Sequence, residues 1–122
     1  MSRRTFYIHE RNIDHAEVQA VTFMFEPTKM GFWRIGAAIC TRDDNFDRRI
    51  GRGRAFSRIV QRASSLYASM GDRDLDAALR RYRTGREFGD ATQDDGWHLG
   101  FLLQLFHLAV PHYDGHADKQ RI

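Results

Sequence analysis

Apolar and polar residues alternate along the first third of the chain, a pattern typical of β-strands with a buried face. The strands predicted from this alternation are residues 5–9, 18–25 and 32–41. A proline early and a glycine late in residues 26–31 favour a turn, so the second and third strands should form an antiparallel hairpin. Small residues, among them Gly36 and Ala38, share one face of the third strand, which predicts a closely packed helix against it.

Helical spacing of apolar residues replaces this alternation in the rest of the chain. The predicted helices are residues 43–70, ended by Gly71, residues 72–83, ended by Thr84 and Gly85, and residues 94–110, ended by Pro111. The apolar stripe of the first helix is Phe56, Ile59, Val60, Ala63 and Tyr67. Gly51 and Gly53 each weaken a helix by about 1 kcal/mol, so a start at Arg54 is the alternative. Residues 85–93 are expected to form a loop.

The order of strands followed by helices predicts an α+β fold, a small antiparallel sheet of about three strands covered on one face by about three helices. At 122 residues, we expect a single domain over residues 1–122, with a mobile polar tail at 112–122. The third helix is apolar almost all round. It is either the central core helix or a helix that buries a second face in a partner, for instance in a homodimer.

Cysteine usage and hydropathy favour a cytoplasmic protein without a membrane segment. The single cysteine, Cys40, cannot form an intramolecular disulfide, and we expect it to be a buried small hydrophobe. The most apolar stretch, residues 97–110, is too short to span a bilayer. No apolar run follows the basic residues at the amino terminus, so no secretory signal is expected.

The net charge is +3, and it is concentrated in one segment. Residues 42–70 contain seven arginines and three aspartates. A spacing of four places Arg54, Arg58 and Arg62 on one ridge of the first predicted helix, and Arg48 and Arg52 extend it if the helix starts early. Such a ridge can contact phosphates, grip an acidic protein surface or simply be a solvated helix face. The candidate partner-binding residues are therefore Arg48, Arg52, Arg54, Arg58 and Arg62.

Histidines near the carboxyl terminus are the weakest candidates for chemistry. His107, His112, His116 and Asp114 are residue types that zinc accepts, but their spacing matches no strong zinc motif. We therefore expect no metal and no cofactor, and a small metal-dependent enzyme is only the third hypothesis.

Residues 32–62 carry a pattern that resembles one found in small accessory proteins of bacteriophages and mobile elements. The pattern is Trp33-x-Ile35-Gly36-x-Ala38-x-Cys40, followed by Asp44-Asn45-Phe46-x-Arg48-x-x-Gly51-Arg52-x-x-Ala55-x-x-Arg58. Proteins of this kind often bind and block a host machine, and anti-CRISPR and anti-restriction inhibitors are the best-known examples. Many of these inhibitors are acidic mimics of DNA, whereas the sequence pI here is about 9.4. Only residues 72–95 are acidic enough to form a local acidic patch.

The resemblance and the arginines together lead to two functional hypotheses. The first is a non-enzymatic, phage-type inhibitor that acts in the host cytoplasm by binding and blocking a defence or nucleic-acid-processing complex, such as a CRISPR–Cas effector. The alternative is a small protein that binds DNA or RNA through the same arginines.

Overall fold

A four-stranded antiparallel sheet forms the centre of the protein in a computed structural model, which describes residues 3–11, 13–62, 65–92 and 99–109. The strands are β1 (Phe6–Glu10), β2 (Val18–Pro27), β3 (Phe32–Thr41) and β4 (Tyr67–Gly71), and they lie side by side in this order. The helices are α1 (Arg48–Gln61), α2 (Asp72–Thr92) and α3 (Leu99–Leu105). The predicted α+β class is confirmed.

The hairpin of β2 and β3 matches the prediction from sequence. The two strands pair from Val21 opposite Ile39 to Pro27 opposite Trp33. Gly31 takes a φ of +87° in the turn, a conformation that favours glycine. The Thr28 amide and hydroxyl both donate hydrogen bonds to the Phe32 carbonyl, at 2.9 and 2.8 Å, and close the turn.

The fourth strand corrects the prediction that the first helix continues to residue 70. The helix ends at Gln61, and its cap, Arg62, has a left-handed φ of 56°. The chain then pairs with β3, with Met70 opposite Trp33 and Ala68 opposite Ile35. Ala68 and Met70 alternate with exposed Ser69 and both enter the core, so a strand buries residues that a helix would have spread around its surface.

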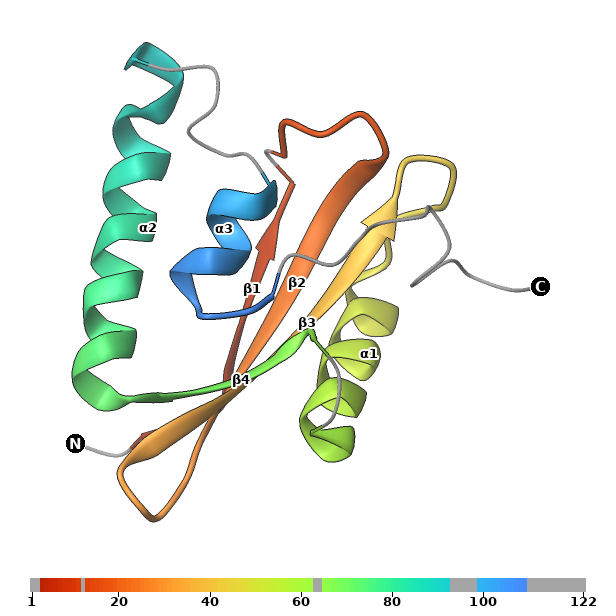
Figure 1. The fold of residues 1–122 in the computed structure, drawn as a ribbon. Helices are drawn as coiled ribbons and strands as arrows, with labels where there is room; N and C mark the ends of the chain where they lie inside the picture. Colours follow the sequence, from red (N-terminus) through yellow and green to blue (C-terminus); the bar gives the residue numbers. More distant parts are fainter. Residues whose placement is uncertain (1–2, 12, 63–64, 93–98, 110–122) are drawn as a thin grey trace.

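Helices cover both faces of the sheet, whereas one covered face was expected (Figure 1). On one face, α2 and α3 pack over a large core that contains Phe23, Phe25 and Phe106. On the other face, α1 packs over a smaller cluster around Met24 and Ala38. Both faces of β2 and β3 are therefore buried, which explains their nearly continuous apolar sequences.

The first helix begins at Arg48, which is neither the expected start in residues 43–45 nor the alternative start at Arg54. The Asp47 carboxylate caps it by accepting hydrogen bonds from the amides of Arg49, at 2.8 Å, and Ile50, at 3.3 Å. Gly51 lies inside the helix because it packs against β2.

The buried side of α1 is also rotated from the predicted stripe. Ala55 and Ile59 are buried, but Phe56 is 48% exposed and Val60 is 62% exposed. The cause is Gly36 on β3, since a Cβ atom there would lie 2.2 Å from the Ala55 carbonyl oxygen. The helix backbone rests directly on the strand at Ala55, with Ile59 buried one turn later, and Phe56 and Val60 face outward.

The remaining helices differ from prediction mainly in length. Residues 85–92, expected as loop, continue α2 beyond Gly85. The leucines of α3 and the adjacent Phe106 are buried, so this segment is the central core helix of the two alternatives. It ends at Leu105, before Pro111, and the chain turns at His107 with a φ of 58°. Residues 94–98 of the predicted helix and the predicted tail lie outside the described residues.

Candidate binding surface around α1

The first helix concentrates positive charge. Its fourteen residues include five arginines and no carboxylate. Gly51 faces Thr22 on β2, and Ala55 faces Gly36 on β3, so the buried line of the helix lies over the two central strands. The arginines are distributed on both sides of this line.

Two of the predicted site residues, Arg48 and Arg52, lie on the side of β1. The Arg52 guanidinium is 5.8 Å from the centre of the Tyr7 ring. His9, the next residue on this face of β1, receives or donates a hydrogen bond at 2.9 Å with the Thr22 hydroxyl. Burial lowers the pKa of His9, and the nearby charges of Arg48 and Arg52 lower it further. Both effects favour the neutral form of the imidazole.

Aromatic rings extend this arrangement into what we call the β1-side cluster, made of Tyr7, His9, Arg11, Phe46, Arg48 and Arg52. Tyr7 and His9 stack with their ring centres 6.4 Å apart. Phe46 meets His9 edge-on at 5.9 Å, and the Arg11 guanidinium lies 5.1 Å from the Phe46 ring. Arginine and tyrosine side chains in close contact are the residue types that dominate binding energy at protein interfaces.

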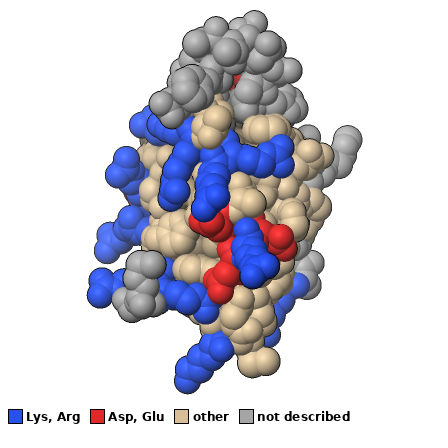
Figure 2. Space-filling view, turned by 90° about the vertical axis from the view of Figure 1, so that its left-hand side faces the viewer, with Lys and Arg blue, Asp and Glu red and all other residues tan. Residues whose placement is uncertain are grey.

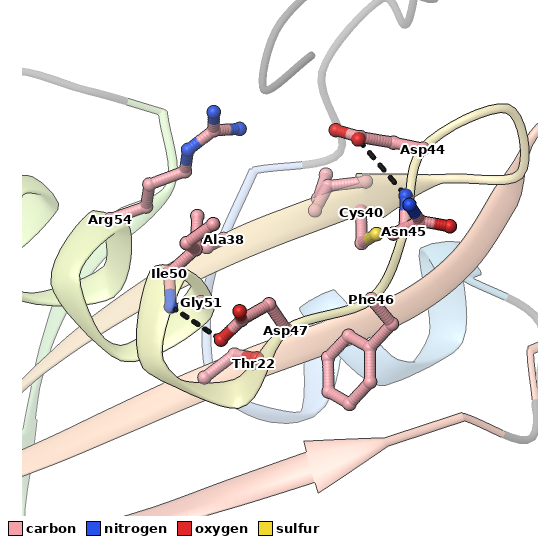
Figure 3. Close-up of a pocket in the computed structure, with 11 residues that line it drawn as sticks. Thr22, Ala38, Cys40, Asp44, Asn45, Phe46, Asp47, Ile50, Gly51 and Arg54 are labelled. Atoms are coloured by element: carbon pink, nitrogen blue, oxygen red, sulfur yellow. Dashed lines mark hydrogen bonds between the residues drawn. The ribbon is translucent and has the colours of Figure 1, made fainter. Parts of the chain in front are cut away.

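Arg54 lies on the opposite side of α1, over a small pocket beside β3 (Figure 3). Cys40 and Asn45 line the same pocket. The Asp44 carboxylate accepts a hydrogen bond from the backbone N–H of Asn45 at 3.0 Å. The cavity volume is about 20 Å³, which is enough for a single water molecule. The pocket has no room for an organic substrate.

Cys40 is half-buried in this pocket, and not fully buried as expected. Its thiol lies 3.6 Å from the Thr41 carbonyl oxygen, and the Gln19 side-chain amide lies 3.9 Å from its sulfur. The same Gln19 amide donates to the carbonyls of Thr41 and Asp44, at 3.1 and 2.7 Å. These bonds hold the β3–α1 loop, so the polar groups around Cys40 have a structural role.

The five predicted arginines therefore do not form one ridge. Arg48 and Arg52 lie on the β1 side, whereas Arg54 lies on the β3 side, and Arg58 follows it by one helical turn. Arg62 leaves the helix in a left-handed conformation. A spacing of four would place Arg54, Arg58 and Arg62 on one side of a helix that continues past residue 62. The helix ends at Gln61, so Arg62 does not share that side.

An exposed row of mixed character lies next to the β1-side cluster. Arg52, Phe56 and Val60 recur every four residues and so share one side of α1, and we call them the α1 outer row. Phe56 and Val60 are among the few large hydrophobic residues that the described surface exposes, and Tyr7, 37% exposed, lies beside Arg52. The surface thus joins apolar side chains to guanidinium groups.

The opposite face of the molecule carries no comparable segregation of charge (Figure 2). The first turns of α2 contain Asp72, Asp74 and Asp76, and the acidic side chains visible on this face lie among basic ones (Figure 2). Asp76 pairs with Arg80, one helical turn later, at 3.0 Å. The acidic side chains at the start of α2 therefore lie among basic ones and do not form a separate acidic patch.

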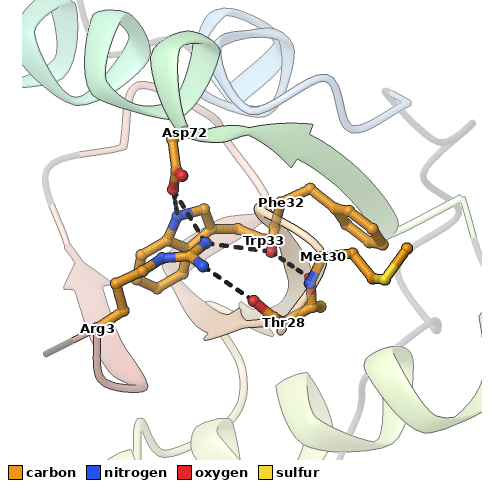
Figure 4. Close-up of polar contacts among 6 residues, drawn as sticks. All are labelled: Arg3, Thr28, Met30, Phe32, Trp33 and Asp72. Atoms are coloured by element: carbon orange, nitrogen blue, oxygen red, sulfur yellow. Dashed lines mark hydrogen bonds and ion pairs between the residues drawn. The ribbon is translucent and has the colours of Figure 1, made fainter.

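A polar clamp joins the amino-terminal segment to the β2–β3 hairpin and α2 (Figure 4). Asp72 accepts a hydrogen bond from the Trp33 indole at 2.6 Å and pairs with Arg3 at 2.9 Å. The Arg3 guanidinium lies 5.0 Å from the Trp33 ring and donates to the Thr28 carbonyl at 2.9 Å. Next to this clamp, a groove of about 390 Å³ opens between Phe6 of β1 and the first turns of α2.

A buried carboxylate connects β1 to α2. Glu10 is 0% exposed, accepts a hydrogen bond from the Tyr82 hydroxyl at 2.5 Å and forms an ion pair with Arg86. Burial raises the pKa of Tyr82, and the hydrogen bond to Glu10 raises it further. The charge of Glu10 raises the pKa of Arg86. This ion pair fixes the end of β1 against α2.

The structure places only one of the four metal-ligand candidates. His107 is exposed after α3, and His112, Asp114 and His116 lie outside the described residues. Within the described ranges, no group of three or more His, Cys, Asp or Glu side chains is arranged to hold a metal ion. In the same ranges, no helix is both long and apolar enough to cross a membrane.

Comparisons with known proteins add no relative, because no family model, no curated protein and no solved structure matches the chain at a significant level.

The sequence analysis missed the contribution of β1 to this surface. The signal was present in the alternation of residues 6–10, where Phe6 and Ile8 pack into the core and Tyr7 and His9 face the other side. It was not used because α1 was expected on the same face as the other helices. Phe56 and Val60 were missed for a related reason, since both had been assigned to the core.

Proposed function

We propose that the protein is a binding protein of the phage-inhibitor type, which attaches to a protein complex of a bacterial host and blocks it. The α1 outer row and the β1-side cluster form the contact. The observation that carries this proposal is the exposure of Phe56 and Val60 in line with Arg52. Burying apolar side chains stabilises protein–protein contacts, and the arginines on the β1 side, Arg11, Arg48 and Arg52, add complementarity to carboxylates.

The partner surface should therefore have an apolar area with carboxylates beside it. Protein interfaces combine such an apolar core with aromatic residues and arginine. The backbone of duplex DNA offers phosphates to the arginines, but it offers no apolar surface on which both Phe56 and Val60 could be buried. The nucleic-acid alternative also relied on one continuous row of five arginines. In the structure Arg48 and Arg52 lie on one side of α1, Arg54 and Arg58 lie on the other, and Arg62 follows the end of the helix.

An affinity capture from a bacterial lysate tests the proposal, with the tagged protein exposed to DNase and RNase before elution. Direct titrations of free duplex DNA and single-stranded RNA are run in parallel. The proposal predicts a nuclease-resistant protein partner and weak binding to either nucleic acid. Recovery that disappears with nuclease, together with direct binding that falls steeply with salt, would replace it with the nucleic-acid alternative.

A further inference from the structure

The open edge of the sheet at β1 has the features of a strand-addition site. β1 pairs with β2 on one side, and no described strand pairs with its other side. Alternate residues of an edge strand direct their N–H and C=O groups outward, where an extended peptide can bind them. Main-chain hydrogen bonds supply affinity in this mode, and the side chains on the two faces of the strand supply specificity.

The α1 face of this edge is cationic. Tyr7 and His9 point to this face, with Arg48 and Arg52 beside them. Arg4 and Arg11, both exposed, flank the two ends of β1. Glu10, the carboxylate within the strand, faces α2 and is already paired with Arg86.

The α2 face of the edge is apolar. Phe6 stacks on Phe25 at 4.6 Å and meets Trp33 edge-on at 5.6 Å. Phe6 and Trp33 line the groove of about 390 Å³ together with Leu75 and Leu79 of α2. The carboxylates at its rim are neutralised, Asp72 by Arg3 and Asp76 by Arg80. The groove thus has room for an aliphatic side chain from a strand added to β1.

We propose that β1 binds an extended segment of the partner as a fifth strand of the sheet, in which carboxylates alternate with apolar residues. Its acidic side chains face Arg48 and Arg52, and its apolar side chains enter the groove at Phe6. The inference deepens the proposed function, on which it rests, by naming the chemistry of the bound segment. A second copy of this chain is a poor occupant, because antiparallel pairing of two β1 strands would bring the arginines at their ends together.

A display library of random nine-residue peptides, selected against the full chain, tests this proposal. We expect the enriched peptides to alternate acidic and apolar residues. Binding should slow hydrogen exchange at the β1 amides that point away from β2. Arg52→Glu should weaken binding about tenfold, whereas Arg54→Glu, a matched change on the other side of the same helix, should leave it within about twofold.

N-methylation of the peptide backbone gives a second test, because it removes main-chain hydrogen bonds to β1 and leaves the peptide side chains unchanged. An enriched peptide is synthesised in two forms, each N-methylated at one of its two sets of alternate amides. One form should lose binding, because only one edge of the peptide pairs with β1, and the other form should retain it. Enrichment of no peptide, unchanged exchange in β1, or equal binding of both methylated forms would overturn the proposal.

The outcomes separate this inference from the proposed function. A nuclease-resistant partner that binds without protecting β1 would leave the inhibitor proposal standing and remove strand addition. If selected peptides protect β1 but the protein captures no nuclease-resistant partner, strand addition would stand and the inhibitor proposal would fall.

Discussion

Gly36 on β3 lies so close to Ala55 on α1 that an added Cβ atom would be 2.2 Å from the Ala55 carbonyl oxygen. A second close contact lies one helical turn before Ala55, where a Cβ atom on Gly51 would be 2.4 Å from the Thr22 hydroxyl oxygen. The helix is seated on the sheet by these two glycines. Its seating determines which residues face outward, and so it places Arg52, Phe56 and Val60 on the surface.

Alanine substitutions at the two glycines of α1 should have opposite effects on stability. A Cβ atom on Gly53 would meet nothing within 4 Å, so Gly53→Ala should raise the free energy of unfolding by about 1 kcal/mol through better helix propensity. Gly51→Ala should lower it by about 1–3 kcal/mol, because the added methyl group overlaps Thr22. Urea denaturation of both variants measures the difference, and equal stabilisation by the two would contradict the close seating of α1.

Gly36→Ala should be more harmful than Gly51→Ala. Its clash is with a backbone carbonyl, which cannot rotate away as a threonine side chain can. We expect a loss of about 3 kcal/mol or failure to fold. A Gly36→Ala variant as stable as the wild type would show that α1 moves freely away from β3.

Stability should depend on pH through His9. Its pKa is lowered in the fold, mainly by burial, so the unfolded chain binds more protons between that lowered value and the ordinary value of 6.5. Stability should therefore be full above pH 6.5 and fall as the pH decreases below it. Denaturation curves at several pH values compare the wild type with His9→Gln, which cannot titrate. A pH dependence of equal size in both proteins would exclude His9 as its source.

Loss of Arg86 should be costly because it removes a cation that pairs with the buried Glu10 carboxylate. We expect Arg86→Ala to lower the free energy of unfolding by about 3 kcal/mol. Adding Glu10→Gln to this variant should recover part of the loss, since an amide still accepts the Tyr82 hydrogen bond without burying a charge. A double variant less stable than Arg86→Ala alone would show that the carboxylate is stabilised by other groups.

The clamp at Trp33 should depend more on Asp72 than on Arg3. Asp72→Ala leaves the Trp33 indole N–H without the acceptor it has at 2.6 Å, and should cost about 1–2 kcal/mol. Arg3→Ala removes a partly exposed ion pair and should cost less than about 1 kcal/mol. Thermal unfolding ranks the two variants, and the reverse order would contradict the proposed role of Asp72.

The strands of the sheet were predictable from the sequence to different degrees. β2 and β3 followed from alternation and a strong turn, and the small face of β3 correctly indicated a helix against it. β4 was missed because Tyr67 continues the apolar spacing of Phe56 and Val60, so local pattern favoured a longer helix. Only pairing with β3 distinguishes the two, and such pairing is a tertiary contact that local periodicity does not contain.

The candidate site shows the same limit. The concentration of arginines in residues 48–62 was visible in the sequence, but their division between two sides depends on which side of α1 is buried. A helix wheel assigns the largest apolar residues to the core. Here Gly51, Ala55 and Ile59 take that place, because β2 and β3 approach the helix backbone at Gly51 and Ala55. Phe56 and Val60, which the helical spacing predicted to be buried, therefore lie on the surface.

The central claim is that the protein binds a host protein complex through the exposed side of α1. Its most direct test is the affinity of the captured partner for wild-type protein, for Phe56→Ala/Val60→Ala and for Met30→Ala, an exposed apolar control in the β2–β3 turn. The double variant should keep its stability and bind about thirtyfold more weakly, equivalent to about 2 kcal/mol, with Met30→Ala unchanged. Equal affinity of all three proteins would contradict the claim.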